Sequence, residues 1–337
     1  MSRIAINGFG RIGRGFVRAL FASDRRGEIE VVAINDLAPV ENLAYLLKYD
    51  SVYGRAPFSV ATENGAFLID GKRVTLMQEK DPVLLPWKDM NVDIVIESTG
   101  RFTSADKAQA HITAGAKRVV ISAPGKGEGV DTVLIGANEE KFGACPITSN
   151  ASCTTNAISP LVGILDEAIG IERALLNTTH AYTATQSIVD SVAPDDFRRG
   201  RAGAMNLGPS STGAAKATSL AYPQLKDKFD GIAVRVPVPA GSIADVTFVP
   251  KRATTVEEVN GALRKAATSE RWKRVFAVSD EQLVSTDILG LPYGSIADLT
   301  MTRVVDGMLV KVLAWYDNEM GYAHTLVEHV ASVAERL

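Results

Sequence analysis

The 337-residue sequence has few cysteines and histidines, and this scarcity excludes several classes of protein. Its only two cysteines, Cys145 and Cys153, stand eight residues apart, which fits no common zinc or redox spacing. So few cysteines also argue against a disulfide scaffold. The histidines number four. The sequence therefore predicts no metal site and no disulfide framework.

A strong charge bias and long apolar runs are missing as well. The net charge is −3, and hydrophobic residues make up 46% and charged residues 22% of the chain, as in a soluble globular protein. Neither nucleic acid nor an anionic membrane is therefore expected as an obligatory partner. No run approaches the ~18 apolar residues of a membrane span, and no leader-like segment precedes the first expected strand. We expect a cytoplasmic protein of two domains.

A glycine pattern near the N-terminus indicates a dinucleotide site. A short apolar run precedes Gly8, Gly10 and Gly13 in the order Gly-x-Gly-x-x-Gly, and a helical pattern follows. The first glycine permits a tight turn, the second lets a pyrophosphate approach the backbone, and the third lets helix and strand pack closely. Asp36 ends a second expected strand, at the distance typical of an acid that binds the adenosine ribose and repels the 2′-phosphate of NADP.

Strands and helices alternate through the first half of the chain. Helices are expected at 43–47 and 104–114, a hairpin at 58–60 and 66–69 around Asn64-Gly65, and strands at 74–76, 92–97, 118–122 and 132–135. This alternation predicts a Rossmann-type, doubly wound and mainly parallel α/β sheet. His111 falls in a helix that we expect at the surface, and we assign it no role.

The pattern changes after about residue 172. Strands are expected at 175–179, 232–236, 243–249, 295–305 and 308–315, and helices at 255–267, opened by a capping box, and 319–337. This half therefore predicts an α+β domain with a mixed or antiparallel sheet. Residues 184–211 lack periodicity, which is uncommon over such a length unless the segment is functional or packs against a partner.

Cys153 is the candidate nucleophile. It lies within Ser149–Asn156, before an apolar helical pattern, and Ser152 or Asn150 is the expected helix N-cap. Unpaired N–H groups and the helix dipole favour a thiolate there, although most free cysteines are small buried residues instead. His180 ends an expected strand 27 residues later. A thiol and an imidazole near a nicotinamide indicate aldehyde oxidation through a thiohemiacetal and a thioester.

Two further features are candidate anion ligands. Thr212 caps an expected alanine-rich helix that begins at Gly213, and the N–H groups of a helix start can bind an anion. Arg235 lies near the end of the strand expected at 232–236 and offers a planar fork of donors. The alternatives are an ordinary helix cap and a surface arginine.

The sequence resembles the phosphorylating glyceraldehyde-3-phosphate dehydrogenase family over essentially its whole length. The motifs that carry the resemblance are INGFGRIGR, LLKYDSVYGR, ESTGRFT, AGAKRVVISAP, SNASCTTN, HAYTATQ, PSSTGAAKA, AVRVPVP and WYDNE with a following GY. The resemblance implies reversible oxidation of glyceraldehyde 3-phosphate, with NAD and inorganic phosphate, to 1,3-bisphosphoglycerate. It implies an NAD-binding Rossmann domain over residues 1–152, completed by the terminal helix 318–337, and a catalytic domain over residues 153–317.

The same resemblance implies roles for individual residues. Cys153 would be the nucleophile and His180 its base. Inorganic phosphate would bind to Ser152, Thr154, Thr212 and Gly213, and the phosphate of the substrate to Thr183 and Arg235, with Arg199 near both anions. NAD would contact Gly8, Gly10, Arg11, Ile12, Gly13, Asp36, Lys80, Ser122, Asn318 and Tyr322. A homotetramer is implied, in which residues 184–211 approach a neighbouring subunit's cofactor.

Some positions depart from the family pattern and leave alternatives open. Met320 stands where many members have Trp, and residues 190–194 differ in a region that helps to choose between NAD and NADP. Asp36 followed by Leu37 favours NAD, with some NADP use not excluded. One alternative is erythrose-4-phosphate dehydrogenase, which lacks the STGAAK stretch that is intact at residues 211–216. Others are an NADPH-preferring biosynthetic member and a nucleotide-binding regulatory protein without catalysis.

Overall fold

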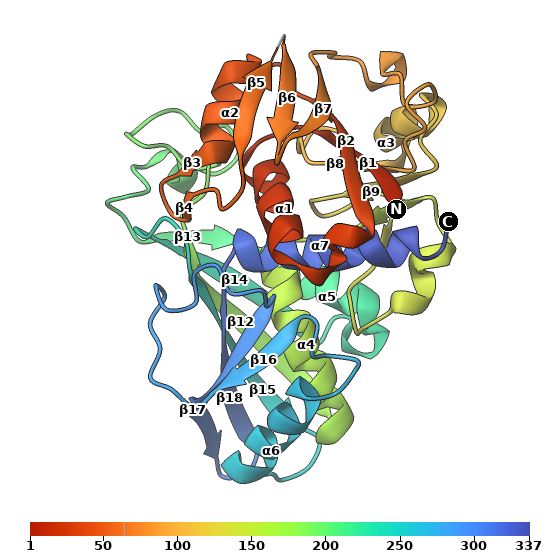
Figure 1. The fold of residues 1–337 in the computed structure, drawn as a ribbon. Coiled ribbons are helices and arrows are strands. Elements are labelled where there is room, and N and C mark those ends of the chain that lie inside the picture. Colours follow the sequence, from red (N-terminus) through yellow and green to blue (C-terminus); the bar gives the residue numbers. More distant parts are fainter. Residues whose placement is uncertain (64) are drawn as a thin grey trace. The chain divides into compact units, whose positions relative to one another are not determined.

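Two compact units make up the chain. The computed structural model describes residues 1–63 and 65–337 (Figure 1). The first unit comprises Met1–Leu134, Asn138–Ala151 and Ala323–Leu337, and the second comprises Ile135–Ala137 and Ser152–Tyr322. Each unit has its own large sheet. The assignment of an NAD-binding domain to residues 1–152 and a catalytic domain to 153–317 stays a prediction.

The sheet of the first unit has the strand order β10-β11-β9-β8-β1-β2-β7-β6-β5. Its strands are β1 Ser2–Asn7, β2 Ile29–Asn35, β5 Val60–Glu63, β6 Ala66–Ile69, β7 Lys72–Met77, β8 Ile94–Glu97, β9 Arg118–Ile121, β10 Asp131–Thr132 and β11 Ile147–Ser149. All pairs from β10 to β7 are parallel, and β5, β6 and β7 pair antiparallel. The expected mainly parallel sheet is confirmed.

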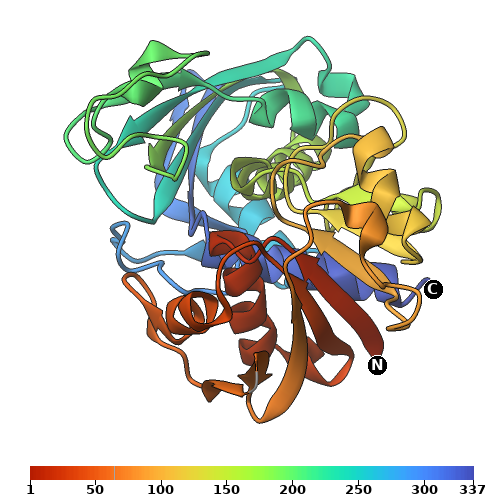
Figure 2. The same ribbon diagram turned by 90° about the horizontal axis from the view of Figure 1, so that it is seen from above.

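Helices cover both faces of this sheet. They are α1 Arg11–Ala22, α2 Val40–Lys48, α3 Ala105–Thr113 and most of α7 Met320–Ala334. In β11, Ile147 packs with Ala108 of α3, while the next residue, Thr148, is hydrogen-bonded to His329 of α7 at 2.8 Å. Because successive strand residues point to opposite faces, α3 and α7 lie on opposite sides, as Figures 1 and 2 show. The sheet is therefore doubly wound.

One local expectation about this unit is wrong, and two others need to be stated more exactly. The strand expected at 132–135 ends at Thr132, because the Asn138 side chain bonds the carbonyl of Thr132 and the N–H of Leu134. α3 is a surface helix as expected, but His111 lies on its inner side and is completely buried, which makes it a structural rather than a solvated histidine. The expected hairpin is present as β5 and β6, with its first strand at Val60–Glu63 rather than at 58–60, and the expected turn residue Asn64 lies outside the described residues.

The second unit has a mixed sheet with the strand order β13-β14-β12-β15-β18-β17-β16. Its strands are β12 Ile171–Ala181, β13 Gly208–Ser211, β14 Phe229–Val236, β15 Ser242–Pro250, β16 Phe276–Ser279, β17 Ser295–Val305 and β18 Leu309–Tyr316. The pairs β12–β14 and β16–β17 are parallel, and the other four are antiparallel. The expected mixed sheet is confirmed, with the unexpected short strands β13 and β16 at its two edges.

Three helices pack on one face of the second sheet, α4 Cys153–Ala168, α5 Ala214–Ala221 and α6 Val256–Ala267. Alternate residues of β12 face these helices and are buried, whereas Leu175 on the opposite face is 65% exposed. Thr255 caps α6 as expected, but the Glu258 carboxylate binds Arg252 and the Thr254 hydroxyl instead of closing the box. Among the described residues, no helix has the length and apolarity to cross a membrane.

Candidate active site

The candidate nucleophile stands at a helix start. Cys153 is the first residue of α4, and the Ser152 hydroxyl caps the helix by accepting the N–H of Thr155 at 3.1 Å. Of the two expected caps, Ser152 is confirmed and Asn150 is not. The Asn150 amide instead donates to the Thr325 hydroxyl at 3.2 Å. The start of α4 therefore places the thiol beside the N–H groups of the first helical turn, as the sequence predicted.

The alternation of β12 brings an imidazole to this thiol. His180 shares the buried face of β12 with Leu176 and Thr178, the face on which α4 packs. Its Nε2 lies 3.4 Å from the Cys153 sulfur. On its other side, Nδ1 lies 2.7 Å from the carbonyl oxygen of Ala181, which can accept its proton. In the tautomer that carries its proton on Nδ1, the lone pair of Nε2 faces the sulfur, as a base requires.

A guanidinium adjoins the imidazole. β14 runs parallel to β12 with Arg235 in register with His180. One guanidinium nitrogen of Arg235 lies 2.9 Å from Nδ1 of His180 and 3.2 Å from the carbonyl of Ala181. Arg199 donates two hydrogen bonds to the Ser210 hydroxyl, at 3.0 and 3.2 Å, and its charge acts on Arg235. Two arginines thus concentrate positive charge beside the thiol–imidazole pair.

Burial sets the protonation of the pair. It raises the pKa of the Cys153 thiol, and this effect exceeds the lowering by the Arg235 charge and by hydrogen bonds from Thr154. Burial, together with Arg235, lowers the pKa of His180 to about 4. At neutral pH the resting pair is therefore a thiol and a neutral imidazole. The thiolate expected from the helix start is not the resting form, because desolvation outweighs the helix N–H groups.

Tyr316 is a site residue that the sequence did not reveal. This last residue of β18 is fully buried, and its hydroxyl lies 3.0 Å from the Thr154 hydroxyl and 2.7 Å from that of Thr178. Its ring meets the ring of His180 edge to face, with centroids 5.9 Å apart. Tyr316 thereby ties the start of α4 to β12. Buried-strand alternation predicts that it points inward but not which hydroxyls it meets.

The other candidate anion ligands occupy nearby segments of the same unit. The Thr183 hydroxyl lies 2.9 Å from that of Thr185, just beyond β12. Thr212 follows β13 directly, and its hydroxyl accepts the N–H of Ala214 at 3.2 Å. The N-cap of α5 is nevertheless Gly213, not Thr212 as expected. The roles of these residues in binding anions stay predictions.

Two candidate cofactor residues also belong to the second unit. The side-chain oxygen of Asn318 accepts the Gly241 N–H at 3.1 Å and the Ser242 hydroxyl at 3.0 Å. With its oxygen held in this way, the Asn318 amide is left to present its NH₂ group as a donor. Tyr322 is buried, with 3% of its surface exposed.

The glycine loop of the first unit has the form that a dinucleotide requires. At Gly8, with φ of +91°, a Cβ would lie 2.7 Å from the backbone nitrogen of Thr99, and at Gly13 one would lie 2.5 Å from the carbonyl of Gly8. A Cβ at Gly10 would meet nothing within 4 Å. Two glycines therefore serve close packing, while the backbone of the third faces open space. The chain fits a pyrophosphate at this loop.

The remaining candidates for cofactor binding in the first unit differ in their contacts and in their exposure. The Asp36 carboxylate accepts the Phe9 N–H at 2.7 Å, so the loop and the acid are joined directly. Arg11 forms an ion pair with Asp50. The other candidates are the partly buried Ile12, the exposed Lys80, and Ser122, whose N–H donates to the Glu97 carbonyl at 2.9 Å. Within the described chain, no three His, Cys, Asp or Glu side chains gather as a metal site.

Comparisons with known proteins match both halves of the chain. The family model of the glyceraldehyde 3-phosphate dehydrogenase NAD binding domain matches residues 2–105, and that of the C-terminal domain matches residues 152–318. Proteins named glyceraldehyde-3-phosphate dehydrogenase from Mycobacterium avium, Zymomonas mobilis and Streptomyces coelicolor are 48%, 47% and 46% identical to it. Each alignment covers 99% of this chain and 99% of the relative.

Proposed function

Because the chain belongs to the glyceraldehyde-3-phosphate dehydrogenase family, we propose that it oxidises glyceraldehyde 3-phosphate with NAD and inorganic phosphate, reversibly, to 1,3-bisphosphoglycerate. The enzyme is an NAD-dependent oxidoreductase of glycolysis and gluconeogenesis. The observation that carries the chemistry is the 3.4 Å approach of His180 Nε2 to the Cys153 sulfur at the start of α4. A nucleotide-binding protein without catalysis has no need of this thiol–imidazole pair.

Cys153 attacks the aldehyde. Nε2 of His180 takes the thiol proton as the sulfur forms a bond to the carbonyl carbon. The imidazolium then returns that proton to the carbonyl oxygen, which becomes the hydroxyl of a thiohemiacetal, and His180 is neutral again. The neutral imidazole of the resting state is the form that can accept this proton. The helix N–H groups at the start of α4 then favour the negative charge that develops beside them.

His180 acts again in the oxidation. NAD, when bound, supplies a hydride acceptor for the C–H bond of the thiohemiacetal. As that bond breaks, Nε2 of His180 takes the hydroxyl proton and the carbonyl of a thioester forms on Cys153. An oxygen of inorganic phosphate then attacks the thioester carbon, the C–S bond breaks, and the thiolate leaves. The product is the acyl phosphate.

Anion ligands complete the proposed site. We assign the substrate phosphate to Arg235 and Thr183, with Arg199 close by, since the two arginines concentrate positive charge beside His180. We assign the attacking phosphate to the helix starts at Ser152–Thr154 and Thr212–Gly213, which offer backbone N–H groups. The Thr154 hydroxyl already contacts Tyr316, so its backbone N–H is the better donor.

NAD binding is assigned to the glycine loop and its surroundings. The open backbone at Gly10 supports a pyrophosphate there, and Asp36 supports NAD over NADP. The other proposed contacts are Gly8, Arg11, Ile12, Gly13, Lys80, Ser122, Asn318 and Tyr322. For Asn318, the oxygen held by Gly241 and Ser242 supports a contact between its NH₂ group and the nicotinamide carboxamide.

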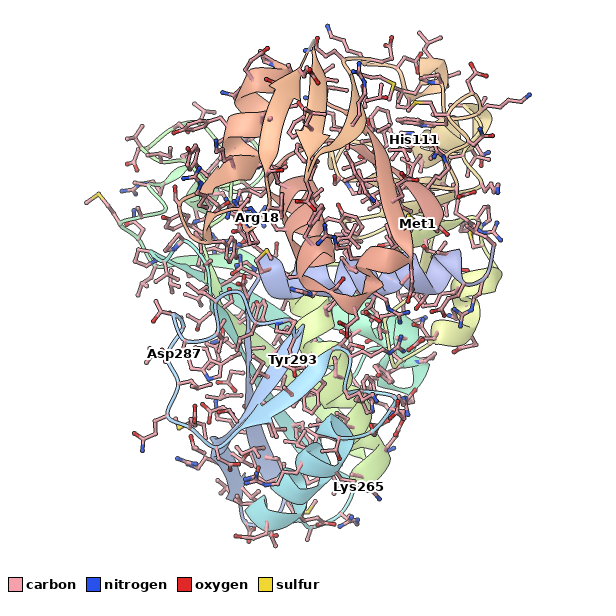
Figure 3. The ribbon with its side chains drawn as sticks, viewed as in Figure 1. Met1, Arg18, His111, Lys265, Asp287 and Tyr293 are labelled. Carbon is pink, nitrogen blue, oxygen red and sulfur yellow. The ribbon has the colours of Figure 1, made fainter. Side chains whose placement is uncertain are left out.

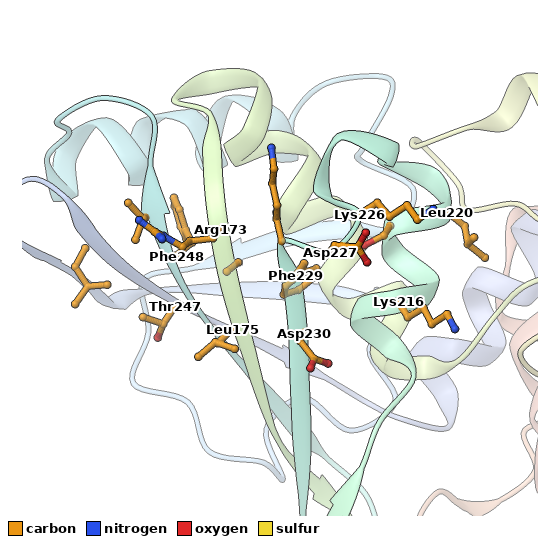
Figure 4. Close-up of a pocket in the computed structure, with 15 residues that line it drawn as sticks. Arg173, Leu175, Lys216, Leu220, Lys226, Asp227, Phe229, Asp230, Thr247 and Phe248 are labelled. Carbon is orange, nitrogen blue, oxygen red and sulfur yellow. The ribbon is translucent and has the colours of Figure 1, made fainter.

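A homotetramer in the cytoplasm is the proposed state of the enzyme. On the face of the second sheet away from the helices, Leu175, Ile232 and Leu309 are exposed, and a hollow of about 900 Å³ opens beside them, lined by Leu175, Phe229 and Leu220 among others (Figure 4). Within 184–211, Val192 is 95% exposed. Apolar surface of this extent supports burial against other copies of the chain.

One matrix of initial rates tests the function. It compares glyceraldehyde 3-phosphate with erythrose 4-phosphate, NAD with NADP, and phosphate with no phosphate. We expect the highest kcat/KM with glyceraldehyde 3-phosphate and NAD, and turnover that requires phosphate. Preference for the four-carbon sugar would overturn the substrate, and phosphate-independent turnover would overturn the acyl-phosphate step.

The two cysteines provide a matched pair of variants. Cys153→Ala is expected to abolish turnover, whereas Cys145→Ala, which removes the other partly buried thiol, is expected to keep it. Alkylation of the wild-type enzyme should likewise inactivate it. Unchanged dehydrogenase activity after modification of Cys153 would exclude the proposed nucleophile.

A further inference from the structure

Three neighbouring strands of the first sheet end in polar side chains that bond to one another. Asn7 is in register with Asn35 on one side and Glu97 on the other, and each is the last residue of its strand. The Asn7 NH₂ group donates to the Glu97 carboxylate at 2.6 Å, and the Asn7 oxygen accepts from Asn35 at 2.8 Å. All three are at least 95% buried. They lie at the edge from which the glycine loop begins.

The buried chain of hydrogen bonds continues at the Glu97 end to an indole. Nε2 of His111 lies 3.2 Å from the Glu97 carboxylate, and the indole N–H of Trp87 donates to Nδ1 of His111 at 3.1 Å. His111 and Trp87 have no exposed surface, and Figure 3 marks His111 among the side chains of this unit. We call Trp87, His111, Glu97, Asn7 and Asn35 the edge network. At its other end Asn35 bonds both the N–H and the carbonyl of Glu79, at 2.9 and 2.8 Å.

The two ends of the edge network fix the direction of every bond in it. An indole N–H can only donate, so Nδ1 of His111 is an acceptor, and its Nε2 carries the proton that reaches Glu97. The backbone of Glu79 likewise fixes the Asn35 amide, which in turn fixes the Asn7 amide. The Asn7 amide and Nε2 of His111 therefore both donate to the same carboxylate oxygen. For this reason Asn7 Nδ2 and His111 Nε2 lie only 3.4 Å apart. Position 97 must accept on both oxygens, which a carboxylate does and an amide cannot.

The same carboxylate holds the loop against which the glycine loop packs. Glu97 accepts the N–H of Thr99 at 2.8 Å and also its hydroxyl. That N–H is the group that a Cβ at Gly8 would strike, and the Ser98 hydroxyl donates to the Gly8 carbonyl at 2.6 Å. A shift of Glu97 would therefore move the backbone under Gly8.

We propose that the edge network positions the glycine loop for NAD, with Glu97 and His111 as positioning residues that do not touch the cofactor. This inference rests on the proposed binding of NAD at that loop. The network joins the ends of the strands that carry the glycine loop, Asp36 and the Thr99 loop. Its bond directions therefore control the dinucleotide end of the cofactor site, not the chemistry at Cys153.

Glu97→Gln tests this directly, because it keeps the shape of the side chain and reverses one bond. In one orientation the new NH₂ group would face the two donors of Asn7 and His111, and neither can turn without opposing Glu79 or Trp87. In the other orientation it would face the N–H of Thr99. We expect the Kd for NAD, and for ADP-ribose as a probe without nicotinamide, to rise by about tenfold or more in equal proportion. The kcat at saturating NAD and the KM for glyceraldehyde 3-phosphate should stay within about twofold of wild type.

Thr148→Val is the matched control for loss of a buried hydrogen bond. It keeps the shape of Thr148, breaks the bond to His329 in the same unit, and leaves the edge network alone. It should lower the melting temperature without changing the Kd for NAD. If Glu97→Gln also lowers only the melting temperature, the network is merely structural and the proposal fails. Normal wild-type turnover in the same assays would leave the proposed function intact.

His111 supplies a second test in case loss of the Glu97 charge prevents folding. In His111→Gln the amide can accept from Trp87 and donate to Glu97, whereas in His111→Leu it can do neither. We expect His111→Gln to keep the Kd for NAD within about twofold of wild type and His111→Leu to raise it by about tenfold. Equal affinities of the two variants for NAD would overturn the proposal.

Discussion

A guanidinium nitrogen of Arg235 lies 2.9 Å from Nδ1 of His180, on the side of the ring opposite the Cys153 sulfur. This contact couples a cation to the base of the proposed reaction. The positive charge disfavours the imidazolium and favours the thiolate, so it lowers the pKa of both His180 and Cys153. A substrate phosphate that neutralised Arg235 would therefore raise the pKa of His180 and make it a stronger base.

The substitution Arg235→Gln should raise the pKa values of both His180 and Cys153. Without the cation, the pKa of His180 rises from about 4 toward its ordinary value, and the already raised pKa of Cys153 rises further. Because alkylation requires the thiolate, the pH profile of iodoacetamide inactivation should shift to higher pH by about one unit. Arg173→Gln, at an exposed arginine on β12, is the control and should leave the profile in place. If the pH profiles of Arg235→Gln and wild type coincide, the charge of Arg235 does not affect the pKa of Cys153.

The second prediction concerns the Asp36 carboxylate and the preference for NAD over NADP. It repels a 2′-phosphate, and it also holds the loop through the Phe9 N–H at 2.7 Å. Asp36→Asn keeps an acceptor for that N–H but removes the charge, so the ratio of kcat/KM for NADP to that for NAD should rise by about tenfold or more. Glu41→Gln, an exposed acid in the first turn of α2, should leave the ratio unchanged. A ratio that does not move in Asp36→Asn would assign cofactor choice to other residues.

The contrast between Asp36 and His111 shows what the sequence could predict. Asp36 and the glycines depend on one strand–turn–helix unit, so their spacing along the chain was sufficient. His111 depends on Trp87 and Glu97, 24 and 14 residues away, and nothing in its own segment distinguishes it from a surface residue. A pattern of residue types does not encode partners that only the assembled sheet and helices bring together.

The active-site pair shows the same limit in another form. Helix capping and strand alternation sufficed to identify Cys153 and His180 as candidates. The protonation of the pair did not follow, because it depends on how completely β12, α4 and Tyr316 exclude water. The helix start and the burial act on the thiol in opposite directions. Only the packed structure determines which is larger.

His329 predicts a pH dependence of stability. It is completely buried, its Nε2 lies 2.8 Å from the Thr148 hydroxyl, and burial lowers its pKa to about 3. The imidazole of His329 binds a proton near pH 6.5 in the unfolded chain but only near pH 3 in the folded chain. The free energy of unfolding is therefore not reduced by this titration above about pH 6.5. Below that pH, the free energy of unfolding should fall by as much as about 1.4 kcal/mol per pH unit.

His329→Gln removes this titration. At pH 7.5 the variant should be less stable than wild type, because it loses packing against Phe142. Below pH 6.5 the difference in unfolding free energy should shrink steadily, since only wild type must bury a neutralised imidazole. Urea unfolding at pH 7.5, 6.5, 5.5 and 4.5 measures this. A difference that stays constant with pH would show that His329 contributes packing alone.

Ala151 carries the last prediction, because its backbone is left-handed just before the nucleophile. Its φ is +53°, its side chain is 1% exposed, and Ser152, the cap of α4, follows it. A left-handed alanine costs about 1–2 kcal/mol, which glycine would relieve, but burial of its methyl group contributes about 0.8 kcal/mol, and glycine adds entropy to the unfolded chain. Ala151→Gly should therefore change the free energy of unfolding by no more than about 1 kcal/mol.

Ala151→Val is the informative partner of that variant. A β-branched residue resists positive φ more strongly than alanine, and two additional methyl groups would have to fit a buried site, so the loss should exceed about 2 kcal/mol. Since Ala151 directs the chain into α4, the alkylation rate of Cys153 should fall in Ala151→Val and stay near wild type in Ala151→Gly. Denaturant unfolding and iodoacetamide kinetics measure the two effects. If valine is tolerated in both assays, the left-handed turn at Ala151 does not determine the position of the thiol.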